Sequence, residues 1–161
     1  MNATFETLDS LLRTLLEEER VLTTLVALAL EEQQALVISD YEAIESVSQD
    51  MQAAAASLEE LEVQREALLR AMDARDATLA DVVPTAHELG VAGFGEARER
   101  LIERATELQE AQERNARLIL NAVKLRERWF NLLGGVGGSS TYGSGGRQDA
   151  SLRRGFVSRS A

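Results

Sequence analysis

Apolar residues recur three and four positions apart over long stretches of this chain, a spacing that predicts long amphipathic helices. The first helix is expected over about residues 4–37, and glutamates occupy its opposite face at 17–19 and 31–32. At 1.5 Å per residue such a helix is about 50 Å long. Its apolar stripe consists of Leu8, Leu11, Leu12, Leu15, Leu16, Leu22, Leu25, Val26, Ala29, Leu30 and Leu36.

A second helix is predicted over residues 41–75. The segment 39–42 reads as a capping box, in which Ser39 bonds the amide of Glu42 and Glu42 reaches back to the amide of Ser39. The alanine run at 53–56 favours helix and would let a neighbouring helix approach closely. The stripe of this helix is Tyr41, Ile44, Val47, Met51, Ala54, Ala55, Leu58, Leu61, Leu68, Leu69 and Met72.

Residues 76–95 are predicted to be an irregular connection. Thr78 to Asp81 can cap a short turn, Pro84 is expected to interrupt or start a helix, and a short helix is predicted near 84–89. Three glycines then break the chain before the next helix, at 90, 93 and 95.

A third helix is predicted over residues 96–133. Its heptad-like seam is Leu101, Ala105, Leu108, Gln112, Asn115, Ile119, Ala122, Arg126, Trp129 and Leu133. Gln112 and Asn115 interrupt the apolar character of this seam. Either they are buried and fix the register of the helix, or they point outward.

Three long helices with short connections predict an all-α fold, an elongated antiparallel three-helix bundle or coiled coil over residues 1–133. Composition changes after Leu133. Residues 134–161 hold eight of the eleven glycines and four arginines against one aspartate, whereas residues 1–133 hold 13 basic and 26 acidic residues. The second domain is therefore predicted to be a flexible Gly/Ser/Arg tail.

The tail carries apolar residues that inert linkers avoid, namely Tyr142, Leu152, Phe156 and Val157. Leu152 and Phe156 are four residues apart, so residues 149–157 can fold as a short amphipathic helix on a partner. A tail that orders when a partner arrives favours a binding protein over a catalyst. The alternative is a solubilising linker without a partner.

Charge and composition restrict the remaining functions. The acidic body disfavours nucleic-acid binding, and the absence of cysteine excludes disulfides and thiolate sites. No signal-peptide pattern is present, and the most apolar stretch, 21–30, is too short to span a bilayer, so a soluble cytoplasmic protein is expected. The glutamate runs are expected to be solvated faces with helical partners, such as Glu66 with Arg70 and Glu96 with Arg100.

Catalytic chemistry has little support. His87 is the only histidine and is interpreted as a solvated loop residue; a di-iron site would need two histidines. The glycines of the tail lack the lysine of a phosphate-binding loop. No catalytic residue, metal ligand or cofactor is predicted. A helical enzyme subunit or metal carrier is therefore the weakest alternative, and a tail that lies on a membrane would bind only weakly.

Three short motifs carry a resemblance to a known family. They are Leu-x-x-Leu-Leu beginning at Leu8, Asn-x-x-Leu-Ile beginning at Asn115, and Thr-Tyr-Gly-x-x-Gly beginning at Thr141. The chain resembles the FlgN family of flagellar export chaperones over essentially its whole length, and the tyrosine motif after three helices is the specific part. Ala116 and Ser144-Gly145 depart from the family pattern, which bears on the fine contacts.

The resemblance implies a non-enzymatic, ATP-independent cytoplasmic chaperone. Its clients would be the hook-associated (hook–filament junction) proteins, kept from premature association and delivered to the export gate of the flagellar type III apparatus. Components of the export ATPase complex are further candidate partners, and stable membrane insertion is not expected. We predict a client surface formed by Trp129, Phe130, Leu152, Phe156 and Val157, and docking on the export gate through Tyr142 and Gly143. The competing hypothesis is a structural coiled-coil adaptor that self-associates and has an inert tail.

Overall fold

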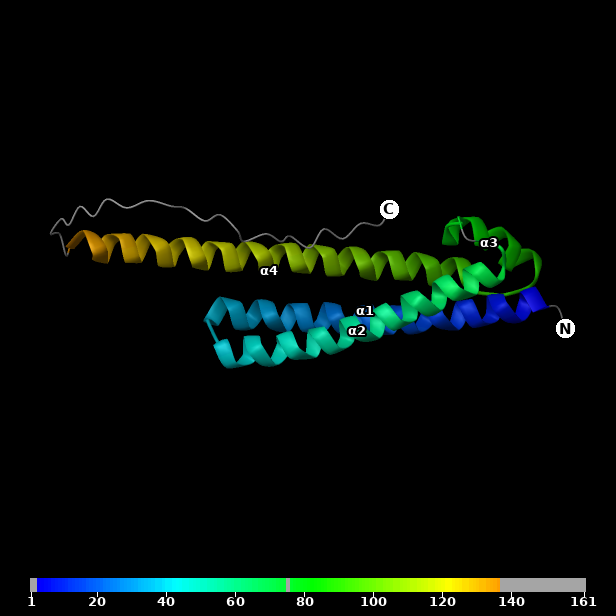
Figure 1. Cartoon of the computed structure of the whole chain (residues 1–161), viewed down its shortest axis with the longest axis horizontal. Helices are drawn as coiled ribbons and strands as arrows, with labels where there is room; N and C mark the ends of the chain where they lie inside the picture. The colour runs from blue at the N-terminus through cyan, green and yellow to red at the C-terminus, as the bar shows by residue number, and fades with distance from the viewer. Residues whose placement is uncertain (1–2, 75, 137–161) are drawn as a thin grey trace, which may run out of the picture. The chain divides into compact units, whose positions relative to one another are not determined.

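The computed structural model describes residues 3–74 and 76–136, and its regular structure there is entirely helical. The helices are α1 (Ala3–Ile38), α2 (Tyr41–Ala71), α3 (Leu79–Glu88) and α4 (Phe94–Val136) (Figure 1). The predicted all-α class is confirmed. The chain divides into two compact units, Met1–Arg126 and Glu127–Ala161, and the described part of the second unit is the final stretch of α4.

A tight turn joins α1 to α2. Ser39 adopts a left-handed φ of 58°, and the amide of Asp40 donates to the carbonyl of Ala35 at 2.9 Å, which closes the end of α1. Asp40, in extended conformation, is the N-cap of α2 and accepts from the amide of Ala43 at 3.1 Å. The predicted Ser39 cap is therefore wrong by one residue, because Ser39 is needed in the left-handed position that ends α1.

Within the first unit, α1 supplies the centre of the core. Arg65 of α2 lies beside Glu18, whereas Arg100 and Asn115 of α4 contact Glu19 and Ala29. Residue numbers therefore rise together in α1 and α4 and oppositely in α1 and α2, as an up-down-up bundle requires. The buried core residues are Leu8, Leu11, Leu15, Leu22, Leu25, Val82, Ala86, Val91, Phe94, Ala97 and Leu101.

The predicted irregular connection contributes to this core. α3 begins at Leu79, where both the amide and the hydroxyl of Thr78 donate to Asp81 Oδ2, at 2.8 and 2.7 Å. The helix continues through Pro84, so the prediction that this proline interrupts or starts a helix is wrong. Burial of Val82 and Ala86 stabilises the helix despite the missing amide donor of the proline.

Two glycines shape the passage from α3 to α4. Gly90 and Gly93 have φ values of 78° and 82°, a left-handed conformation that favours glycine. Between and after them, Val91 and Phe94 turn inward and are 6% and 2% exposed. The segment thus contributes two buried residues to the core, and α4 begins two residues earlier than predicted.

By length and composition alone, α1 would also qualify as a membrane-crossing helix, a wider stretch than the sequence indicated. Its inward residues Leu22, Leu25 and Ala29 are buried in the bundle. The core of the first unit therefore buries one side of α1, and 22% of its most apolar window is buried in all.

Candidate partner-binding site on α4

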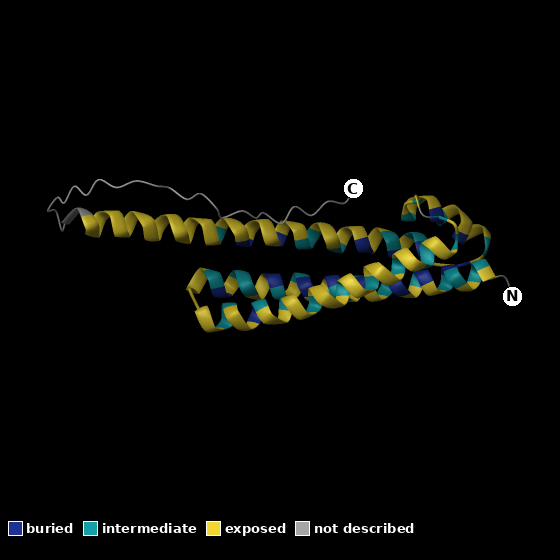
Figure 2. Cartoon of the chain, viewed as in Figure 1, coloured by how far each residue is buried: buried dark blue, intermediate teal, exposed yellow. Residues whose placement is uncertain are grey.

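Large apolar residues of α4 are not confined to the part of the helix that enters the core. In the first half of the helix, Ala97, Leu101, Ala111 and Asn115 are buried. From Ile119 onward the described side chains are exposed, although many are apolar (Figure 2). We call the exposed apolar residues the α4 apolar surface; they are Ile119, Leu120, Val123, Leu125, Trp129, Phe130, Leu132 and Leu133.

The end of α1 explains where burial stops. Asn115 lies level with Ala29 and Glu32, and α1 ends at Ile38. Both helices rise by the same 1.5 Å per residue, so the end of α1 is level with about residue 121 of α4. Beyond that point, the residues of α4 that belong to the first unit, up to Arg126, are all exposed.

Two of the predicted client residues belong to this surface. The side chains of Trp129 and Phe130 are 56% and 66% exposed. Exposed aromatic residues of this kind are frequent anchors of protein interfaces. The other predicted residues, Leu152, Phe156 and Val157 for the client and Tyr142 and Gly143 for the gate, lie outside the described residues.

The two amides of the seam have different surroundings. Asn115 is buried at 3% exposure, and its Nδ2 donates to the carbonyl of Ala29 and to Glu32 Oε2, both at 2.8 Å. Gln112 is exposed. The register interpretation therefore holds for Asn115 and the outward interpretation for Gln112. These bonds define how far along α1 the α4 helix lies.

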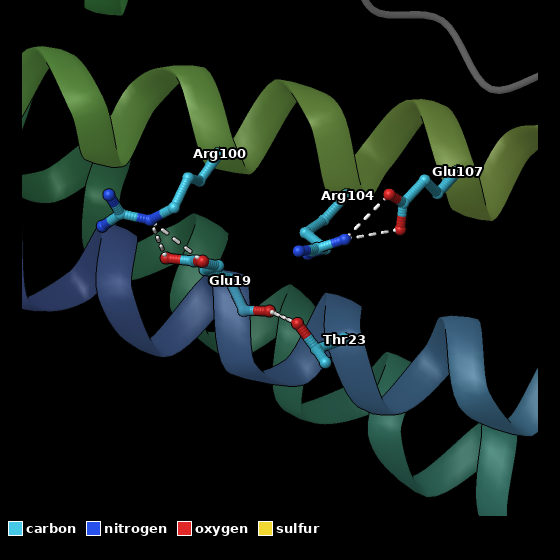
Figure 3. A network of polar contacts seen from close by, with 5 residues as sticks. All are labelled: Glu19, Thr23, Arg100, Arg104 and Glu107. Carbon is cyan, nitrogen blue, oxygen red and sulfur yellow. Dashed lines mark hydrogen bonds and ion pairs between the residues drawn. The ribbon is translucent and has the colours of Figure 1, made fainter.

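A second polar contact joins the same helices. Arg100 Nε donates to both carboxylate oxygens of Glu19 at 3.1 Å, and one turn away Arg104 pairs with Glu107 (Figure 3). The predicted pairing of Arg100 with Glu96 is thus replaced by a contact between helices. The predicted Glu66–Arg70 pair is present at 3.2 Å. The hydrogen bond to the Glu107 carboxylate, together with its charge, raises the pKa of Arg104.

The burial of Glu18 contradicts the expectation that the glutamate runs are solvated. Its side chain is 2% exposed, and neither carboxylate oxygen accepts a hydrogen bond. Arg65 Nε lies 3.4 Å from Glu18 Oε1 without hydrogen-bond geometry. Burial raises the pKa of Glu18, the charge of Arg65 lowers it, and Glu62 raises it further. The signal was present in the sequence, because Glu18 lies three residues after Leu15 and four before Leu22 on the apolar stripe.

The structure gives His87 an exposed position on α3 instead of in a loop. The residues lining the cavity beside it include Val83, Phe94 and Glu99. Among the described residues, no three of histidine, aspartate and glutamate are grouped so that they could hold a metal ion.

Comparison with known proteins gives one assignment. The model of the FlgN protein family matches residues 1–150, which includes both halves of α4 and the Thr141 tyrosine motif. Searches of curated proteins and of solved structures found no match. The match covers most of the chain. The chain therefore belongs to the FlgN family, and this membership supports a role as a flagellar export chaperone.

Proposed function

We propose that this protein is a cytoplasmic export chaperone that binds hook–filament junction proteins, prevents their premature association and delivers them to the flagellar export gate. Family membership supports the chaperone role in general. The single observation that carries the client-binding part is the exposure of the large apolar side chains that make up the α4 apolar surface.

The chemistry of this surface suits a helical client. Contiguous exposed apolar residues on a soluble protein mark interaction sites, and an amphipathic helix is a common occupant of such a site. Basic residues Lys124, Arg126 and Arg128 accompany one acid, Glu127, in the same stretch. A client helix with apolar and acidic residues would complement it. Leu152, Phe156 and Val157 of the tail are proposed to complete the client contact.

Titration calorimetry with the junction proteins of the same cell tests the client site. Replacing Trp129 and Phe130 together by alanine should weaken binding at least roughly 30-fold, because buried aromatic anchors dominate interface energies. The matched control replaces Val63 and Ile102 by alanine, two exposed apolar residues of α2 and α4 outside the surface. Equal affinities for both double variants would contradict the proposed site.

The tail is tested separately by ending the chain at Val136, where α4 ends. The shortened protein should lose client binding while its helix content falls by no more than the deleted residues contribute. Full binding by this protein would remove the tail from the proposed client contact.

The proposed gate contact rests on Tyr142 and Gly143. Tyr142→Ala should weaken binding to the isolated gate domain and spare binding to the client. Tyr41→Ala is the control, since Tyr41 is the other tyrosine and is 79% exposed at the start of α2. If Tyr142→Ala removes client binding as well, Tyr142 belongs to the client site instead.

One observation also suits the self-associating adaptor, because Ile119, Val123, Phe130 and Leu133 of the α4 apolar surface recur at coiled-coil spacing. That function predicts oligomers whose population rises with protein concentration and no binding to junction proteins. Sedimentation of the full chain at several concentrations, with and without the junction proteins, distinguishes the two functions.

A further inference from the structure

A groove lies between α2 and α4, on top of α1. α1 and α2 pack with their Cα atoms within 8 Å of each other, whereas α4 reaches α1 through side chains such as Arg100 and Asn115. The space that remains is a cavity of about 290 Å³. Its lining is Glu18, Leu22, Leu58, Glu62, Arg65, Leu101, Ala105, Leu108, Gln109 and Gln112, all within the first unit.

The lining combines apolar walls with an acidic floor. Leucines of all three helices form the walls, and Glu18 contributes a buried carboxylate whose two oxygens accept no hydrogen bond. Glu62 adds a second carboxylate, while Arg65 is the single basic residue of the lining. When Glu18 is ionised, the groove has one negative charge more than its own residues balance, and a cation that pairs with Glu18 would stabilise this ionised form.

The size and direction of the groove suit side chains presented by a helix. A cavity of about 150 Å³ accommodates a benzene-sized molecule, so about 290 Å³ accommodates a leucine and the stem of a long basic residue. Residues 58, 62 and 65 of α2 and 101, 105, 108 and 112 of α4 line it at helical spacing. Two long helices bordering a third leave open the position that the remaining helix of a four-helix bundle occupies.

We propose that the groove between α2 and α4 is a second client-contact surface, which receives an amphipathic helix of the export client and pairs a lysine or arginine of that helix with Glu18. The inference rests on the proposed chaperone function and adds to it a contact separate from the α4 apolar surface. The bound helix would insert apolar side chains among Leu58, Leu101 and Leu108.

Thiol labelling tests occupancy of the groove in the full chain, which contains no cysteine of its own. Ala105→Cys introduces a thiol at an exposed position of the lining, and Ala56→Cys introduces one at an exposed position of α2 outside it. Saturating junction protein should slow modification of Ala105→Cys by a maleimide at least 10-fold and leave Ala56→Cys within 2-fold. Equal rates with and without client at both positions overturn the proposal.

Affinity provides the second measurement. Ala105→Trp, which fills the mouth of the groove, and Glu18→Gln, which removes the buried charge, should each weaken client binding roughly 10-fold or more. Ala56→Trp is the control, and circular dichroism establishes that each variant is folded. If Glu18→Gln does not fold, Ala105→Trp and the labelling rates still decide the outcome.

The outcomes separate this inference from the function on which it rests. A wild-type chain that does not bind the junction proteins overturns both. A wild-type chain that binds them, with unchanged affinity in Ala105→Trp, overturns only the groove. Protection of Ala105→Cys that rises with protein concentration in the absence of client would show that a second copy occupies the groove, and this also overturns the proposal.

Discussion

Asn115 sets the register between α1 and α4 at the scale of a single side chain. Its Nδ2 donates to Ala29 and Glu32, and its Oδ1 accepts no hydrogen bond in its buried position. Asn115→Ala removes both donated bonds and should lower the free energy of unfolding by about 1–2 kcal/mol. Urea denaturation measures the change. Gln112→Ala, one turn earlier and exposed, should stay within about 0.5 kcal/mol of wild type.

Glu18 makes stability depend on pH in the direction opposite to most carboxyl groups. Burial raises its pKa in the folded protein, so the folded state retains the proton at a pH where the unfolded state has lost it. The buried carboxylate therefore destabilises the folded protein fully at pH values above the pKa of Glu18 in the folded state. This destabilisation diminishes as the pH falls through that pKa and is absent below the pKa of Glu18 in the unfolded state.

Glu18→Gln should therefore stabilise the protein by roughly 1 kcal/mol at neutral pH, and the gain should vanish on acidification below the ordinary range of glutamate. Unfolding in urea at several pH values gives the curve. Glu59→Gln on the exposed face of α2 should stay within about 0.5 kcal/mol at each pH. A gain that persists in acid would mean that side-chain shape, instead of charge, is responsible.

Residue-scale surroundings were only partly predictable from the sequence. The i+3 and i+4 spacing identifies Leu8, Leu11 and Leu15 as buried. Glu18 follows the same spacing, but charged residues are rarely buried, so the sequence alone favours a solvated position for it. Helix periodicity gives the direction of a side chain but not what faces it. This is why Asn115 and Gln112 could not be distinguished before the position of α1 was known.

At the scale of elements, α3 contains Pro84, whose ring nitrogen carries no hydrogen and so cannot donate to the carbonyl of Ala80. Pro84→Ala supplies that donor on an exposed face and should raise the free energy of unfolding by about 1–2 kcal/mol, after allowance for the greater freedom of the unfolded chain. Thermal and urea unfolding measure it. Thr85→Ala, the exposed neighbour, should change stability by less than about 0.5 kcal/mol. A destabilised Pro84→Ala protein would show that the proline fixes the path of α3.

The existence of the three long helices followed from apolar periodicity, since each stripe is many turns long. The ends of these helices and the short helix α3 were harder to predict from the sequence. Helix ends depend on single residues, as when Ser39 takes the left-handed position and Asp40 becomes the cap. α3 contains too few residues for periodicity to reveal it, and its stability comes from the burial of Val82 and Ala86 against other helices.

At the scale of the whole molecule, stability should be distributed unevenly along the chain. Amides in the buried half of α4, residues 97–115, should exchange with solvent slowly. Amides of residues 121–134 should exchange much faster in the free protein, because their side chains are exposed. Hydrogen exchange followed by mass spectrometry checks this, with α1 as the internal reference. Client should slow exchange in 121–134. Equal protection of both halves of α4 in the free protein would contradict the prediction.

The path of α4 beside α1 has a consequence for the order of folding. Arg100 and Glu19 are 81 residues apart in sequence, and Asn115 and Ala29 are 86 apart, whereas α1 and α2 are joined by a tight turn. Local contacts close at little entropic cost, so the hairpin of α1 and α2 should form first and α4 should join it late. During synthesis on the ribosome, Glu18 and the leucines around it would therefore remain partly exposed in the hairpin of α1 and α2, until the α4 residues that complete the core emerge, just ahead of the α4 apolar surface.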